Sequence, residues 1–82
     1  MTVPSHAKLI WNCRRGMLEL DLVLARFIEQ HMKHLNDQQL CVFERLLNYP
    51  DPDLYAYLMG QSLPDDEEIK QFVAYIRTDH SV

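Results

Sequence analysis

Glycine and β-branched residues are scarce in this chain. Its 82 residues include two glycines and only 11 residues of the types valine, isoleucine and threonine. Because β-branched side chains favour strands and long unbranched ones favour helices, this composition excludes a strand-rich fold. A chain of this length builds one small hydrophobic core. We therefore expect an all-α fold, a single domain over residues 1–82 that forms a compact five-helix bundle and is monomeric.

Long apolar runs and a disulfide framework are also missing. No run approaches the roughly 20 apolar residues that a membrane-spanning helix needs, and the first residues show no basic stretch followed by an apolar core. The two cysteines, Cys13 and Cys41, are interpreted as small buried hydrophobic residues with free thiols. These features predict a cytoplasmic protein without membrane insertion.

Positive charge is in short supply as well. Eight Lys and Arg residues stand against twelve Asp and Glu residues, which gives a net charge of −4 at pH 7. Since a nucleic-acid-binding surface needs clustered basic residues to neutralise phosphates, this balance argues against a nucleic-acid partner. The charge is uneven, because residues 1–35 carry +2 and residues 36–82 carry −6. The two halves therefore present different surfaces to a partner.

Capping residues mark the boundaries of the first three helices. Ser5 can cap a short first helix, and Gly16 is its natural stop because glycine adopts a positive φ freely. Apolar residues recur at helical spacing over residues 17–35, which predicts a longer second helix. Asn36 and Gln39 have the spacing of a capping box, so a third helix is expected to begin there.

Prolines and a second glycine divide the rest of the chain. Asp51 followed by Pro52 predicts the cap and first turn of a short fourth helix, which Gly60 ends. Pro64 and the acidic run over residues 65–68 fit the first turn of a fifth helix, where negative charge meets the positive end of the helix dipole. The expected buried face of this helix consists of Ile69, Phe72, Val73 and Ile76.

Three groups of residues could carry chemistry, and each has a simpler structural interpretation. The spacing of His31, His34 and Cys41 is compatible with zinc, but a structural site needs four ligands, and histidines at a helix end also suit its dipole. The four tyrosines could stack on a flavin, yet tyrosines at helical spacing more often pack their rings and leave the hydroxyl in water. The acidic run over residues 65–68 could bind a metal, but it fits a helix start better. We favour the structural interpretation of all three and expect no bound metal.

The segment around the first glycine is harder to explain by packing alone. Arg14 and Arg15 place two positive charges beside Gly16, at a turn where the backbone is accessible and side-chain bulk is absent. Glu19 follows at the start of the next helix, where it can interact with the helix dipole or pair with Arg15. We call this turn, with Arg14, Arg15, Gly16 and Glu19, the corner. A turn of this kind suits docking to another molecule.

This corner resembles a motif of the SdhE family. The family's Arg-Gly-x-x-Glu motif is matched by Arg15, Gly16 and Glu19. Its surroundings match the family at Trp11, Cys13, Arg14, Leu20 and Asp21. A second matching stretch includes Leu46, Leu47, Asp51, Pro52, Asp53, Leu54, Leu58 and Met59. The resemblance spans about residues 8–76 and departs at Tyr57, where many members have tryptophan.

The resemblance implies a function and a set of binding residues. Members of this family are assembly factors that promote covalent attachment of FAD to the flavoprotein subunit of succinate dehydrogenase. By this resemblance Arg15, Gly16 and Glu19 form the surface that contacts the flavoprotein, with Arg14 and Asp21 at its border. The factor is not an enzyme and binds no cofactor tightly, because the flavoprotein forms its own bond between a histidine and the flavin. The homologous flavoprotein of fumarate reductase is the expected second partner.

Two other functions remain open from the sequence. Members of the family have also been described as the antitoxin of a toxin–antitoxin pair, although this chain offers no DNA-binding half. A small flavin-binding protein is the other alternative, and the lack of a glycine-rich, phosphate-binding loop disfavours it.

Overall fold

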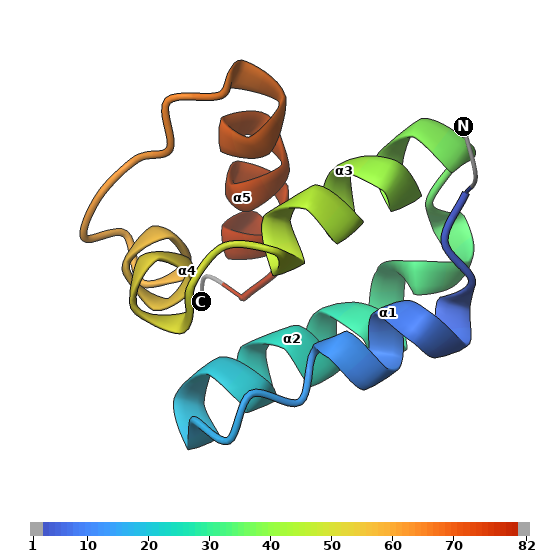
Figure 1. Ribbon diagram of the computed structural model, residues 1–82, viewed down its shortest axis with the longest axis horizontal. Coiled ribbons are helices and arrows are strands. Elements are labelled where there is room, and N and C mark those ends of the chain that lie inside the picture. The colour runs from blue at the N-terminus through green and yellow to red at the C-terminus, as the bar shows by residue number, and fades with distance from the viewer. Residues whose placement is uncertain (1–2, 81–82) are drawn as a thin grey trace.

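The structure confirms the all-α fold and the five helices. The computed structural model describes residues 3–80, with side chains described up to residue 77. The helices are α1 (His6–Asn12), α2 (Leu18–His31), α3 (Asp37–Leu47), α4 (Asp51–Leu58) and α5 (Glu67–His80), and a 3₁₀ turn, η1 (Met32–His34), follows α2. In Figure 1, α1 and α2 lie together on one side, α4 and α5 lie on the other, and α3 runs between these two pairs. Residues 3–80 contain no strand.

Three of the expected helix boundaries are confirmed. The hydroxyl of Ser5 accepts a hydrogen bond from the backbone N–H of Lys8 at 3.1 Å and so caps α1. The capping box at the start of α3 is present, because Asn36 and Gln39 each accept the other's backbone N–H through a side-chain oxygen. Gly60 directly follows Met59, the C-terminal cap residue of α4. Its φ of +77° is expected of a glycine that ends a helix.

The other boundaries differ from the sequence predictions. Helix α1 ends at Asn12 with Cys13 as its cap, so Gly16 lies in the following loop and is not the helix stop. Helix α2 stops at His31 and does not continue to residue 35, because the chain tightens into η1. Pro50 takes the cap position of α4 and Asp51 is already helical, so the predicted Asp51 cap is wrong. Helix α5 begins at Glu67, because the carboxylate of Asp66 accepts the N–H groups of the second and third helical residues. Pro64 and Asp65 therefore lie outside the helix, and Asp66 caps it.

An aromatic cluster joins three helices at the centre of the core. Phe27 of α2 packs edge-on against Phe43 of α3 and Phe72 of α5, with ring centroids 5.6 Å apart in both pairs. The predicted inward face of α5 is confirmed, since all four of its apolar residues are buried. The fully buried side chains are Phe27, Phe43, Leu9, Leu20, Leu24, Leu46, Leu54, Ile69, Ile76 and Val73. Burial of this apolar surface is the main stabilising term of so small a fold.

The two cysteines occupy different environments. Cys13 is buried in the core, whereas Cys41 is only half-buried, so the expectation of two buried thiols holds for the first alone. Burial raises the pKa of the Cys13 thiol to about 12 and keeps it protonated, although the nearby guanidinium of Arg15 acts in the opposite direction. Within residues 3–80, the search for a helix long and apolar enough to cross a bilayer finds none.

Candidate functional site

The loop between α1 and α2 turns at Gly16. Its φ is +82°, in the left-handed region that glycine adopts without steric cost. Apart from Gly16 itself and its two neighbours in the chain, a Cβ atom placed there would have no heavy atom of this protein within 4 Å. The fold therefore explains the glycine through its backbone angle alone and leaves the space beside it open.

Asp21 holds this loop in shape from within α2. Its carboxylate accepts the backbone N–H of Arg15 at 2.9 Å and that of Gly16 at 3.2 Å. Met17 occupies the N-cap position of α2 but makes no side-chain hydrogen bond to the helix. The carboxylate of Asp21, one turn inside the helix, orders the preceding loop instead. The sequence placed Asp21 at the border of a contact surface, whereas in the structure its carboxylate faces the loop backbone of its own chain.

The side chain of Arg15 is directed into the protein. Its guanidinium donates a hydrogen bond to the carbonyl oxygen of Leu47, at the last residue of α3, and lies 3.6 Å from the carboxylate of Asp51. A cation at a helix C-terminus also interacts favourably with the helix dipole. Arg15 therefore ties the loop to the junction of α3 and α4, and its contact with a partner stays a prediction.

Glu19 makes a second connection to α4. Its carboxylate accepts a hydrogen bond from the hydroxyl of Tyr55 at 2.9 Å, and this bond, together with the negative charge, raises the pKa of that hydroxyl. Of the two roles that the sequence left open for Glu19, the pairing with Arg15 is not the one formed, because each of the two side chains has a partner on α4. Asp51 and Tyr55 lie four residues apart, on one face of that helix.

The two sequence stretches that resemble the family thus meet in space. Arg15 and Glu19 come from the first stretch, and Asp51 comes from the second. No pattern in the sequence indicated Asp51 and Tyr55 as partners of the motif. Each contacts a residue 36 positions away in the chain, and such contacts leave no local periodic signal. The polar residues of the motif thus fix the orientation of the corner relative to α4.

Arg14 and several apolar side chains of the first two helices are exposed. Arg14 is exposed, and its side chain takes part in no ion pair or hydrogen bond among the described residues. Four of the six large apolar side chains that are exposed in the described part of the chain lie on α1 and α2: Ile10 at 42%, Trp11 at 72%, Leu18 at 74% and Leu22 at 59%. The sequence analysis did not identify this surface, although apolar residues opposite the buried stripe of an amphipathic helix would have signalled it.

The zinc and flavin alternatives find little support in the geometry. Among the side chains that the structure describes, up to residue 77, there is no group of three or more placed to hold a metal ion. The ring of His31 stacks on Phe27, and its Nδ1 lies 3.1 Å from the hydroxyl of Tyr75. Tyr49 and Tyr57 pack edge-on against each other. The packing interpretation of the tyrosines is confirmed, since all four are partly buried against the core, and the hydroxyls of Tyr55 and Tyr75 also contact polar groups of the protein.

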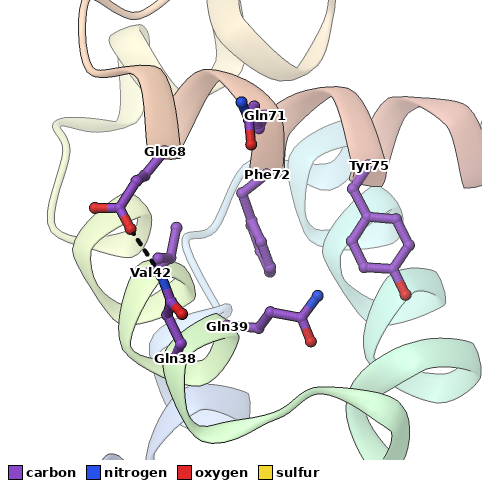
Figure 2. Close-up of a pocket in the computed structure, with 7 residues that line it drawn as sticks. All are labelled: Gln38, Gln39, Val42, Glu68, Gln71, Phe72 and Tyr75. Atoms are coloured by element: carbon purple, nitrogen blue, oxygen red, sulfur yellow. Dashed lines mark hydrogen bonds between the residues drawn. The ribbon is translucent and has the colours of Figure 1, made fainter.

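A separate pocket of about 290 Å³ lies between α3 and α5. Figure 2 shows the residues that line it: Gln38, Gln39, Val42, Glu68, Gln71, Phe72 and Tyr75. The amide of Gln38 donates a hydrogen bond to Glu68 at 3.2 Å, and the side chain of Gln39 caps the backbone of α3. Because these polar groups already bind one another, this pocket offers fewer free contacts than the α1–α2 corner.

The fold and the corner define a small all-helical protein whose exposed apolar surface, beside the side chain of Arg14, is suited to binding another protein. The comparison with known proteins makes the assignment specific. Residues 7–80 match the model of the Sdh5 family, described as the flavinator of succinate dehydrogenase, and the chain belongs to this family.

Named relatives agree with this assignment over nearly the whole chain. A protein named FAD assembly factor SdhE from Legionella pneumophila (strain Lens) is 49% identical over 71 residues, which cover 87% of this chain and 89% of the relative. The protein of the same name from Coxiella burnetii is 43% identical over 78 residues, or 94% and 95% of the two chains. That from Pectobacterium atrosepticum is 40% identical over 95% of this chain and 89% of its own length.

Proposed function

We propose that this protein is an assembly factor that binds the flavoprotein subunit of succinate dehydrogenase and promotes covalent attachment of its FAD. The observation that carries the proposal is the family match over residues 7–80, which includes the open corner at Gly16. The antitoxin alternative has no support in the family description or in the names of the relatives.

In this proposal the chain supplies binding and orientation, and the flavoprotein supplies the reacting groups. FAD belongs to the partner, where its isoalloxazine ring becomes bonded to a histidine. A bound factor that holds the partner's parts in the reactive arrangement lowers the entropic cost of bringing that histidine and the flavin together. The factor itself needs neither a nucleophile nor a tightly bound cofactor for this role.

The geometry of the corner argues against FAD as a direct ligand of the same loop. The amides of Arg15 and Gly16 could otherwise hold a phosphate, but both already donate to the carboxylate of Asp21. That carboxylate would also repel a pyrophosphate. The corner therefore suits a protein surface better than it suits a dinucleotide.

The proposal extends to the setting in which the factor works. We expect it to act as a monomeric single domain in the cytoplasm, where a reducing environment keeps Cys13 and Cys41 as thiols. The flavoprotein of fumarate reductase is the proposed second partner, because it is homologous to the first and its FAD requires the same covalent step.

Replacement of Gly16 by arginine tests this proposal. The new side chain extends into open space, so Gly16→Arg should keep a cooperative thermal transition while it blocks the approach of the partner. The control is Gly60→Arg, which places the same side chain at the other positive-φ glycine, outside the corner, where the flexible end of the Arg77 side chain has to move aside. The readout is in-gel fluorescence of the denatured flavoprotein, which reports only covalently held flavin.

We expect Gly16→Arg cells to accumulate flavoprotein with little covalent FAD, and Gly60→Arg cells to resemble the wild type. Wild-type fluorescence with an expressed and folded Gly16→Arg protein would contradict the docking role of the corner. Equilibrium titration of the isolated factor with FAD tests the alternative. Saturable binding of free FAD would favour a flavin-binding protein over a factor that binds the flavoprotein.

A further inference from the structure

A groove of about 640 Å³ runs between α1 and α2 and reaches the corner. The residues that line it are Ile10, Cys13, Arg14, Gly16, Asp21, Leu22, Ala25, Ile28 and Glu29. In Figure 1 the two helices lie beside each other at the lower edge of the molecule. The groove therefore continues the surface around Gly16 along most of the length of α2.

The walls of this groove are apolar and exposed. Ile10 of α1 and Leu22 of α2 both line it, and both rank among the exposed large apolar side chains. Residues 3–80 contain no sheet edge, and the amides within a helix are bonded internally, so a partner cannot bind here by adding a strand. Affinity must come from apolar side chains inserted between α1 and α2, the mode in which an amphipathic helix binds a groove.

Among the charged side chains that line the groove, Asp21 already accepts the amides of Arg15 and Gly16 at the corner, which leaves Arg14 and Glu29 to meet an occupant. Arg14 lies at the end formed by the corner, and Glu29 lies near the other end, at the last turns of α2. Neither side chain has an ion pair or a hydrogen bond within the described residues. A complementary occupant therefore carries a carboxylate at one end of its apolar face and a basic residue at the other.

We propose that this groove binds an amphipathic helix of the flavoprotein, whose acidic end lies against Arg14 and whose basic end lies against Glu29. The inference rests on the proposed function and specifies the segment of the partner that the corner receives. The helix direction follows from the dipole, since the negative C-terminal end of the bound helix is favoured beside Arg14. Gly16 then permits close approach of that end.

A second copy of this chain fits the groove less well. Outside α1 and α2, the exposed large apolar side chains of the described residues are Val3 and Leu63, and neither belongs to a helix. A second copy could therefore offer only its own α1–α2 surface. Two hollows that face each other leave their apolar walls unfilled, whereas a single helix fills one.

Replacement of Leu22 tests the apolar part of the proposal. Leu22→Asp places a charge in the groove, and the matched control Leu63→Asp makes the same change at a similarly exposed leucine outside it, 63% against 59% exposed. For the purified flavoprotein we expect Leu22→Asp to raise Kd about tenfold or more and Leu63→Asp to change it less than about twofold. The thermal transitions of both variants should match that of the wild type.

The charged ends provide a second, independent test. Arg14→Glu and Glu29→Lys each place like charges beside the proposed helix, and each should weaken binding more at low salt than at high salt. Lys33→Glu is the control, because Lys33 is exposed on η1 and does not line the groove. An effect of Lys33→Glu equal to that of Arg14→Glu, together with an opposite effect of Glu29→Lys, would reduce the charge argument to net charge and overturn the proposed orientation.

A photocrosslinking amino acid at position 22 identifies the occupant directly. The expected product joins this position to a helical segment of the flavoprotein with apolar residues three and four apart and opposite charges at its ends. Crosslinks between two copies of the factor, or a dimer that Leu22→Asp disrupts, would overturn the proposal in favour of self-association. Saturable FAD binding that Leu22→Asp abolishes would overturn it in favour of a flavin site.

The outcomes for the groove and for the proposed function are distinguishable. If Gly16→Arg prevents binding of the flavoprotein and Leu22→Asp does not, the groove proposal fails and the assembly function stands. If the wild-type factor does not bind the flavoprotein at all, the proposed function itself fails. Loss of binding in both variants, with retention in Leu63→Asp and Gly60→Arg, supports both.

Discussion

Both glycines of this chain follow a helix and have nearly the same backbone angle, yet their surroundings differ. Gly16 has a φ of +82° and Gly60 a φ of +77°. A Cβ atom on Gly60 would lie 2.6 Å from Nη2 of Arg77, whereas one on Gly16 would meet nothing of this chain within 4 Å apart from Gly16 itself and its two neighbours. The same conformational requirement thus produces two exposed turns, one covered only by the end of the Arg77 side chain and the other open.

The regions around the two glycines differ in the same way. Near the α4–α5 connection, charged groups bind one another: Arg45 of α3 pairs with Asp66 and Glu68 at the start of α5. Around α1 and α2, Arg14 stays unpaired within the described residues, and apolar side chains face the solvent. The comparison indicates that one region is organised for internal stability and the other for an external contact.

The largest expected difference concerns two aromatic residues, one in each region. Phe72→Ala removes a buried ring that packs against Phe27 and Phe43, and should lower the free energy of unfolding by about 3 to 5 kcal/mol. Trp11→Ala removes a ring that is mostly exposed, and should change this free energy by less than about 0.5 kcal/mol. Urea denaturation followed by circular dichroism measures both. Similar losses in the two variants would contradict the assignment of Trp11 to an external surface.

The adjacent arginines sharpen the comparison within the corner itself. Arg15→Ala removes the hydrogen bond to the carbonyl of Leu47 and the pairing with Asp51, and should destabilise the protein by about 2 kcal/mol. Arg14→Ala should leave stability unchanged and weaken flavoprotein binding. The melting temperature and Kd of each variant separate the two roles. A lower melting temperature for Arg14→Ala than for Arg15→Ala would contradict the assignment of Arg15 to the interior and Arg14 to the contact surface.

The two glycines offer a test with equal structural cost. Gly16→Ala and Gly60→Ala each place a Cβ on a residue with positive φ, which should cost about 1 kcal/mol of stability in both cases. The end of the Arg77 side chain is flexible and can move away from the new methyl group of Gly60→Ala. Only Gly16→Ala should also weaken flavoprotein binding, by about threefold or more. Equal Kd values for the two variants would remove the distinction between the open and the covered turn.

The smallest expected effect concerns the exposed ion pairs of Arg45. The hydrogen bond from Arg45, assisted by that from Gln38, lowers the pKa of the Glu68 carboxyl. Because the folded pKa is depressed, this group contributes stability above its unfolded pKa, and the contribution is lost as pH falls through the folded pKa. Arg45→Gln should therefore melt slightly earlier than the wild type at about pH 7, and the difference should vanish by about pH 3. A difference that grows on acidification would contradict this sign.

The sequence predicted the helices well because their signals are local. The capping box of Asn36 and Gln39 and the apolar spacing that buries Phe72 both depend on residues within two helical turns of each other. The predicted starts of α4 and α5 were wrong because two local signals competed at each of them. Asp51 has the residue type of a cap but is helical, and Asp66 caps α5 although the proline two residues earlier suggested an earlier start.

The features of the candidate site are likewise of two kinds, those set by neighbouring residues and those set by contacts between distant residues. The sequence alone determined that a glycine turn beside two arginines joins the first two helices, because positive φ and charge clustering are properties of neighbouring residues. Only the tertiary structure decided which of these residues face inward: Arg15 reaches α3 and α4, Glu19 reaches α4, and Asp21 holds the loop. The physical reason is that such partners lie far apart in the chain, so that only helix packing brings donor and acceptor within hydrogen-bonding distance.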